Sequence, residues 1–215
     1  NDLLRESDAT VEISANVENI GDLTDTQDVA LVVAGETRDT ASVELDGGGD
    51  ETVTFDLDPT TLTLGDRTIT VESDESTQTA TRTVRDPVPA TFTAEVDEDK
   101  LTRGETATAT FENTGDQTDE QTVSLDLLVN GDVIASKEST ETLASGDSTS
   151  LTVTVPDATR AGTYDSTLVA SSDDQTTSDP VTVDFGEIND GIAAASAGDT
   201  VNVAPGTYDG GIDVE

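Results

Sequence analysis

A duplication is the feature of this sequence that most restricts its fold. Residues 18–31 read ENIGDLTDTQDVAL and residues 112–125 read ENTGDQTDEQTVSL, so nine of these fourteen positions are identical at a constant offset of 94. Looser similarity continues on both sides. Self-similarity at a fixed spacing predicts a repeated structural unit, and 215 residues accommodate two domains of about 90 residues each with a short tail.

Both copies alternate apolar and polar residues along short segments. The apolar positions of one such segment are Val11, Ile13, Ala15 and Val17, and residues 107–111 repeat the pattern in the second copy. A period of two predicts half-buried strands, and each Asn-x-Gly-Asp predicts a turn. About seven short strands per copy, with turn signals every 8–12 residues, are typical of an immunoglobulin-like sandwich. The predicted fold class is all-β, with two tandem Ig-like β-sandwiches followed by a short helix and a β tail.

The predicted domains are residues 1–86, 87–186 and 187–215. Asp86-Pro87-Val88-Pro89 marks the junction, where two prolines favour a short semi-rigid linker. The second copy opens with a strand, Phe92-Thr93-Ala94-Glu95-Val96, that at the same offset would fall before residue 1 of the first copy. The first sandwich is therefore predicted to lack its first strand, which leaves an open edge or groove for a strand from elsewhere.

The tail predicts a short helix from Ile188 to about Ala195, a strand at Val201 and Val203, and a last strand at Ile212-Asp213-Val214. The stretch Gly198 to Tyr208, which reads GDTVNVAPGTY, resembles the entry coil of a right-handed parallel β-helix of the pectate-lyase type. One such coil cannot bury its own apolar face. Either the chain is part of a longer β-helix protein, or its terminal strands pair with another subunit.

Charge restricts the environment and the partners. Acids outnumber bases 47 to 9, giving a formal charge of −38. Such self-repulsion is screened in brine, because the Debye length is about 3 Å at 1 M salt, and halophiles keep acidic surfaces of this kind. Intrinsic disorder is the alternative interpretation, but the regular alternation favours a folded chain. The charge argues against nucleic acid and against anionic membranes.

The residue types also argue against catalysis. The chain has no His and no Cys, so the usual general bases, nucleophiles and soft metal ligands are missing. Paired carboxylates could hydrolyse glycosides, but close acidic pairs are inevitable at this composition. No enzyme activity and no cofactor are predicted, apart from diffuse cations. The acids that could hold a structural Ca²⁺, with a solvated acidic turn as the alternative, are Asp22, Asp25, Asp28, Asp97, Glu98, Asp99, Asp116 and Asp119.

The two copies resemble the CARDB-like and related Ig-like domains of haloarchaeal surface proteins. The resemblance rests on Asn-x-Gly-Asp at Asn19 and Asn113, on a turn from Leu143 to Asp147, and on Gly162-Thr163-Tyr164. Tyr164 could be a tyrosine-corner hydrogen bonder or a plain core aromatic. The resemblance implies adhesion, stalk or spacer roles outside the cell, with other surface proteins or glycans as further partners.

Three hypotheses follow for an extracellular structural protein. The first is a filament subunit that polymerises head to tail by donor-strand exchange. The second is a stalk that carries an adhesin or a β-helix carbohydrate-active domain, and the third is an S-layer-type envelope protein. For the filament, the acceptor edge is Val11, Ile13, Ala15 and Val17, and the donor side comprises Val201, Val203, Tyr208, Ile212 and Val214.

Overall fold

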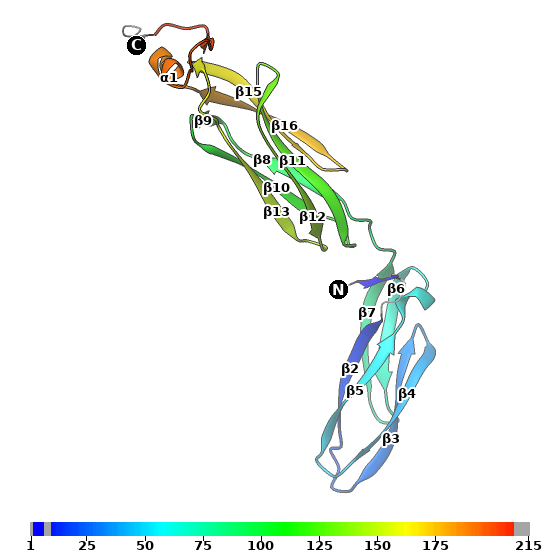
Figure 1. Ribbon diagram of the computed structural model, residues 1–215. Coiled ribbons are helices and arrows are strands. Elements are labelled where there is room, and N and C mark those ends of the chain that lie inside the picture. Colours follow the sequence, from blue (N-terminus) through cyan, green and yellow to red (C-terminus); the bar gives the residue numbers. More distant parts are fainter. Residues whose placement is uncertain (1, 7–9, 209–215) are drawn as a thin grey trace. The chain divides into compact units, whose positions relative to one another are not determined.

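A computed structural model describes residues 2–6 and 10–208 and confirms an all-β chain (Figure 1). It divides into two compact units, with the boundary between Pro87 and Val88. The second unit includes the tail, for which the sequence predicts a separate segment from residue 187. Within residues 2–6 and 10–208, no helix is long and apolar enough to cross a bilayer.

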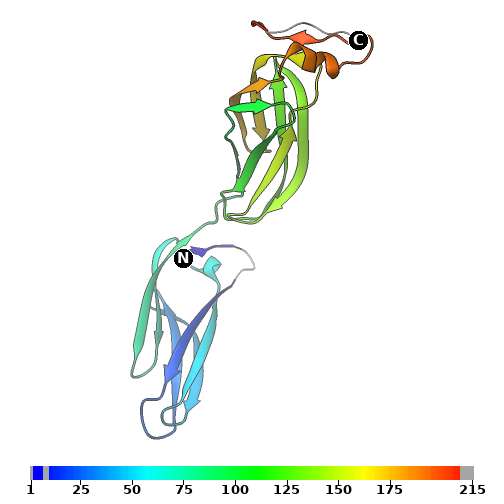
Figure 2. The ribbon, with the colours of Figure 1, turned by 90° about the vertical axis from the view of Figure 1, so that its left-hand side faces the viewer.

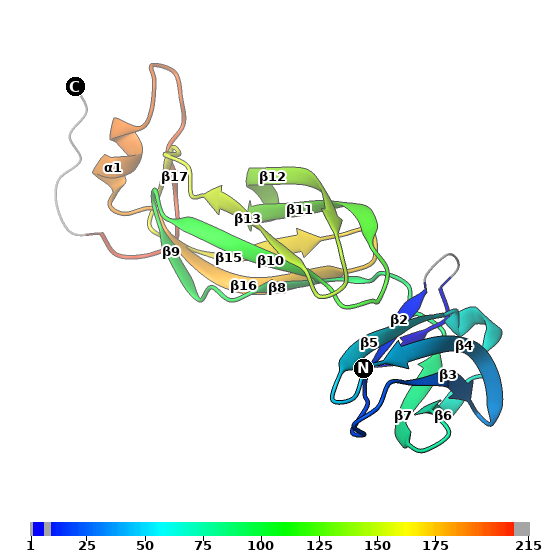
Figure 3. The ribbon, with the colours of Figure 1, turned by 90° about the horizontal axis from the view of Figure 1, so that it is seen from below.

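The first domain packs a large sheet against a small one. The large sheet has the order β1 (Leu3–Leu4), β7 (Thr77–Arg85), β6 (Gly65–Glu72), β3 (Asp25–Val33) and β4 (Glu36–Leu45). The small sheet pairs β2 (Val11–Glu18) with β5 (Asp50–Leu57). A single 3-10 turn, η1 (Pro59–Thr61), follows β5. Figure 3 shows the β2–β5 layer lying across from the larger sheet.

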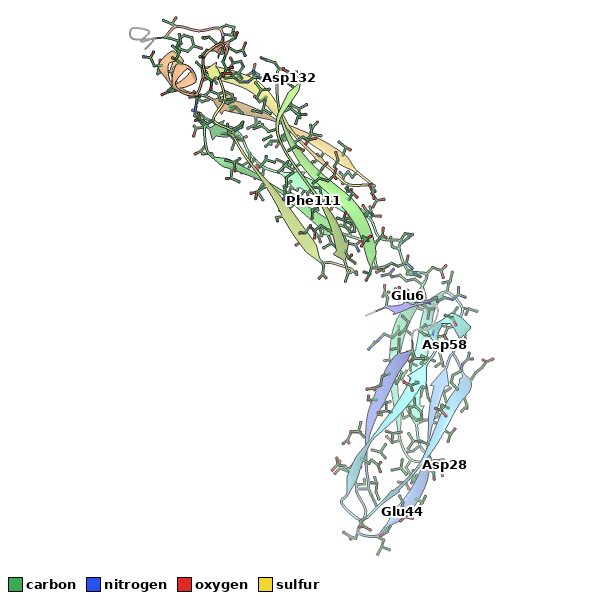
Figure 4. All side chains as sticks on the ribbon, in the orientation of Figure 1. Glu6, Asp28, Glu44, Asp58, Phe111 and Asp132 are labelled. Carbon is green, nitrogen blue, oxygen red and sulfur yellow. The ribbon has the colours of Figure 1, made fainter. Side chains whose placement is uncertain are left out.

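Local sequence explains these strands. β3 and β4 are joined through Ala34 and Gly35, whose positive φ values of 52° and 85° suit a tight hairpin. Inward positions of β3 and β5, such as Leu31 and Phe55, are buried, while the alternate positions are exposed on β5 and half-buried beside Leu31 on β3. Asp28 and Glu44, on the outer surface, carry part of the charge (Figure 4).

The second domain repeats this order and adds one strand. Its large sheet runs β12 (Asp132–Leu143), β11 (Asp119–Val129), β15 (Thr163–Ser171), β16 (Thr176–Asp184) and β9 (Lys100–Thr102). Its small sheet runs β13 (Ser148–Thr154), β10 (Thr106–Asn113) and β8 (Phe92–Val96). β9 pairs in parallel with β16 as β1 does with β7. In the two sheets of the sandwich, the domains thus differ in one strand, because the first has no described counterpart of β8.

The core of the second domain contains four aromatic side chains among Leu, Val and Ala. Phe92, Phe111 and Phe185 are fully buried, and Figure 4 shows Phe111 inside the sandwich. The rings of Tyr164 and Phe185 meet edge to face, with centroids 5.7 Å apart. Such a pair adds to the burial of apolar area.

The tail folds back onto the end of the second domain that lies opposite the linker (Figure 2). It contains the helix α1 (Ile188–Ala193) and the strand β17 (Asn202–Val203), which pairs in parallel with β14 (Arg160–Ala161). The prediction that Val201–Val203 is a spare strand is therefore wrong. Its backbone is already bonded, with Asn202 N donating to Thr159 O at 2.9 Å and Ala204 N to Ala161 O at 2.9 Å.

Candidate strand-binding site

In the second domain, β8 pairs with the edge of β10 that β13 leaves open. We call the space that β8 occupies its slot. The two strands pair antiparallel in five positions, from Phe92 opposite Asn113 to Val96 opposite Ala109. The Phe92 side chain is completely buried in the core. β8 therefore both closes the small sheet and supplies a core anchor.

The turn between β15 and β16 holds β8 from the other side. Asp174 Oδ2 accepts a hydrogen bond from Phe92 N at 3.0 Å, and Ser172 Oγ donates to Phe92 O at 3.1 Å. Gln121 also donates to the Asp174 carboxylate. These two hydrogen bonds, that of Gln121 first and that of Phe92 second, lower the pKa of Asp174, because they favour its charged form.

The entrance to the slot is a turn that the incoming chain crosses closely. Asn113 Oδ1 accepts from Thr91 N at 3.2 Å, and Thr114 N donates to Thr91 O at 2.9 Å. A Cβ on Gly115 would lie 2.1 Å from Pro89 O. Only glycine allows this approach of backbone to backbone.

The equivalent slot of the first domain is open. Among the described residues, β2 pairs with β5 alone. A groove of about 910 Å³ runs beside it. We call it the first-domain groove, and its apolar lining consists of Ala15, Val17, Ile20, Leu23, Val29, Val43, Leu45 and Val71.

Exposure differs at equivalent positions. Ile13, Ala15 and Val17 on β2 are only half-buried, whereas residues 107, 109 and 111 on β10 are fully buried. Likewise, Val71 is half-buried, while Ala170 at the same position on β15 is fully buried. The first-domain groove therefore exposes apolar surface that β8 covers in the second domain.

The polar groups that hold β8 also have counterparts in the first domain. Asn19 pins the entrance turn as Asn113 does, accepting from Gly21 N at 3.0 Å and donating to Leu23 O at 2.8 Å. Ser73 Oγ accepts from Glu75 N at 3.4 Å and Ser76 N at 3.3 Å.

This turn reproduces the geometry around Ser172, whose Oγ accepts from Asp174 N at 3.3 Å and Gln175 N at 3.1 Å. Sequence reasoning missed Ser73, Glu75 and Gln27, the counterparts of Ser172, Asp174 and Gln121. The similarity of residues 72–77 (ESDEST) to residues 171–176 (SSDDQT) was the available signal.

The entrance of the first-domain groove is more apolar than that of the second domain. Ile20 is 89% exposed and Leu23 is 80% exposed. Thr114 and Gln117 occupy these two positions in the second domain. Exposed apolar side chains that border a groove are typical of an interaction surface.

The predicted Ca²⁺ ligands do not come together as a cluster. Within residues 2–6 and 10–208, no three or more acidic side chains lie close enough to hold a metal ion. Two of the candidates have structural contacts instead. Asp116 Oδ2 accepts from Val88 N at 2.7 Å and so holds the end of the linker, while Asp25 caps its own strand by accepting from Thr26 N at 2.9 Å.

The described donor candidates lie in the docked tail. Tyr208 Oη donates to Ala204 O at 2.7 Å, and Val203 is 44% exposed. Tyr164 Oη donates to Asn202 O at 2.9 Å, so it anchors β17 instead of making a tyrosine corner. Burial raises the pKa of Tyr164, with the charge of Arg160 opposing the shift. Ile212 and Val214 lie outside the described residues.

Comparisons with known proteins leave the family open. No protein-family model and no curated protein matches the chain, so the resemblance to CARDB-like domains stays a prediction. Two similar solved structures are red sea bream transglutaminase, at 12% identity and TM-score 0.33, and the fibronectin(III)-like modules of Clostridium thermocellum CbhA, at 14% identity and TM-score 0.31. The match covers 85% of this chain and 30% of the transglutaminase, and 87% of this chain and 90% of the CbhA modules. The Ig-like class rests on the strand order itself.

Proposed function

We propose that this chain is a non-enzymatic structural protein of a halophilic cell surface, and that copies of it join head to tail into a filament. The first domain of one copy accepts a β-strand from the C-terminal tail of the next. The observation that carries the proposal is the first-domain groove, open where β8 closes the second domain. Addition of a strand to a free sheet edge is a recurrent mode of recognition, in which main-chain hydrogen bonds give affinity and side-chain pockets give specificity.

Strand polarity supports a C-terminal donor. β8 starts at the entrance turn of its slot, at Thr91, and runs antiparallel to β10. A strand of this kind starts at Asn19 in the first-domain groove, so the chain that precedes it lies outside the domain. A C-terminal extension of another copy has this direction.

The two ends of each domain also suit head-to-tail joining. The entrance at Asn19 lies at the end of the first domain opposite the end where β7 pairs with β1 and the chain leaves. The docked tail lies at the end of the second domain opposite its linker. Donor and acceptor thus occupy the outer end of each domain, and a contact between unlike surfaces that does not close on itself produces a filament.

Charge makes assembly dependent on salt. The groove is bordered by Glu18, Asp22 and Glu75, and the tail after Tyr208 carries Asp209, Asp213 and Glu215. These like charges repel one another until salt screens them. We expect filaments in molar KCl and monomers on dilution to about 0.1 M, where the Debye length is about 10 Å.

Deletion of residues 209–215 tests the filament. This change leaves the docked segment up to Tyr208 in place, so the expected product is a folded monomer that forms no filaments in molar KCl by electron microscopy. The matched control replaces the same seven residues with a Gly-Ser sequence. Filaments formed by either variant would contradict the donor role of the tail.

A second candidate function is a stalk that carries a β-helix domain. The observation in its favour is the parallel pairing of β17 with β14, next to α1, at the outer end of the second domain. In a stalk, a neighbouring part of the same polypeptide would occupy the first-domain groove. Mass spectrometry of the native protein separates the candidates, because a mature chain that continues for hundreds of residues favours the stalk.

A further inference from the structure

We propose that Ile212 of one copy takes, in the first-domain groove of the next, the place that Phe92 takes in the second domain. This register rests on the proposed strand exchange. It aligns Ile212-Asp213-Val214-Glu215 with Phe92-Thr93-Ala94-Glu95. In both segments an apolar anchor is followed by a polar residue, a second apolar residue and an acid. Because successive side chains of a strand point to opposite faces, both segments place their apolar residues on one face.

The residues before the anchor fit the entrance. Gly210 and Gly211 align with Ala90 and Thr91, the residues that cross the entrance turn of the second domain. There, a Cβ on Gly115 would lie 2.6 Å from the Ala90 Cα. Gly21 has the equivalent position in the first domain, and a Cβ on it would approach only Asn19 Oδ1, at 3.2 Å. Glycines on the incoming chain suit such a close approach.

Three side chains of the first domain are placed to bind the backbone of this strand. By analogy with the contacts of β8, Asn19 Oδ1 accepts from Gly211 N, and Glu75 accepts from Ile212 N. Ser73 Oγ donates to Ile212 O, as Ser172 Oγ does to Phe92 O at 3.1 Å. In the second domain, Asn113 Oδ1 already combines the two roles required of Asn19, since it accepts from both Gly115 N at 3.0 Å and Thr91 N at 3.2 Å.

The register also accounts for the apolar entrance. Tyr208 aligns with Val88, so the docked tail of the donor copy comes next to Ile20 and Leu23. The half-exposed Val203 of that tail is available to cover them. The entrance of the second domain contacts the linker, through Thr114 N and Thr91 O, and its equivalent positions are the polar Thr114 and Gln117.

Cysteine pairs measure the register directly, because the natural chain has no Cys. In the proposed register Asp213 lies opposite Glu18, as Thr93 lies opposite Glu112. Shifting the strand by two residues instead places Asp213 opposite Asn16, as Glu95 lies opposite Thr110. Opposed residues of antiparallel strands have Cα atoms about 4.5–5.5 Å apart, within the range for a disulfide.

The experiment oxidises the double variants Glu18→Cys/Asp213→Cys and Asn16→Cys/Asp213→Cys in molar KCl and compares them on denaturing gels. We expect a ladder of covalent multimers from the first variant and its loss in the second. The reverse result overturns the register. Filaments that form without either cross-link overturn the insertion of Ile212 into the groove.

A second experiment, with a synthetic peptide, tests the strand register without requiring filament formation. A synthetic peptide of residues 207–215 with Asp213→Cys is oxidised with chains of residues 1–208 that carry Glu18→Cys or Asn16→Cys. Preferential cross-linking to Glu18→Cys supports the register even if the protein forms no filaments, in which case only the proposed function fails. Equal or absent cross-linking to the two variants overturns the register.

Discussion

The two domains share one strand order and differ in whether one slot is filled. In the second domain β8 buries Phe92 and brings Asn113 and Gln121 out of contact with solvent. In the first domain the equivalent Asn19 and Gln27 are half-buried beside an open groove. Groups equivalent to those that hold β8 are therefore present in both domains, while β8 itself has no counterpart among the described residues of the first. The same strand order thus forms a closed slot where a five-residue strand is present, and an open groove where the described residues provide none.

Apolar side chains on β2 of the first domain are less buried than those on β10 of the second domain. Val17 stands where the second domain has Phe111, and it is half-buried. Full burial of one large apolar side chain stabilises a fold by about 1.5–3 kcal/mol relative to leaving it exposed. In the proposed filament, a strand that covers the first-domain groove would add a contribution of this size to the stability of the first domain.

Truncation of the anchor gives the largest difference between the domains. Phe92→Ala removes a fully buried ring and is expected to lower the stability of the second domain by about 3–5 kcal/mol. Urea unfolding in molar KCl, followed by hydrogen exchange in each domain, should show early loss of protection in β10 and none in β2. Val88→Ala, at an exposed position, serves as the control, and equal destabilisation of both domains would contradict the comparison.

The entrance glycines give the next largest difference. Gly115→Ala places a Cβ 2.1 Å from Pro89 O, and such overpacking costs about 1–3 kcal/mol. The matched variant Gly21→Ala meets only Asn19 Oδ1 at 3.2 Å, so the free first domain should keep its stability to within about 0.5 kcal/mol. Gly21→Ala should nevertheless weaken filament formation, as measured by light scattering. Equal losses of stability in the two variants would contradict the prediction, because they would show that glycine at this turn is required for a reason other than contact with the chain at Pro89.

The docked tail marks a second difference, because it belongs to the second domain alone. Tyr164→Phe removes the hydroxyl that donates to Asn202 O at 2.9 Å and is expected to cost about 1 kcal/mol. Exchange of the Asn202 and Ala204 amides, which donate to Thr159 and Ala161, should accelerate, while β10 keeps its protection. Unchanged exchange at these two amides would mean that other contacts hold β17.

The sequence predicts the two sandwiches more readily than it predicts the contacts of the tail. Long alternating segments such as Val11–Glu18 leave a clear period of two, and the offset between the copies points to β8 as the extra strand. Two-residue strands such as Leu3–Leu4 and Arg160–Ala161 are too short to leave a period.

The sequence therefore gives no signal for the partner of β17, and it predicts a spare strand in the tail. The turn groups Ser73 and Glu75 were within reach, because the segments 72–77 and 171–176 are similar at an offset of 99, five more than that of the main repeat. A pattern predicts which residues face inward, but it does not show which surface they meet.

The carboxyl that holds β8 gives the smallest expected effect. Hydrogen bonds from Gln121 and Phe92 lower the pKa of Asp174 in the folded state, so its contribution to stability is complete above the unfolded pKa of about 3.9. That contribution is lost as the pH falls through the lowered folded pKa. Asp174→Asn should therefore reduce the Tm of the second domain slightly at pH 7 and leave the difference from the natural chain smaller at pH 2. Glu75→Gln, the matched change in the first domain, should leave the Tm of the free monomer unchanged, because no strand there donates to it. A pH-independent effect of Asp174→Asn would indicate that the lost contact does not depend on the charge of the carboxylate.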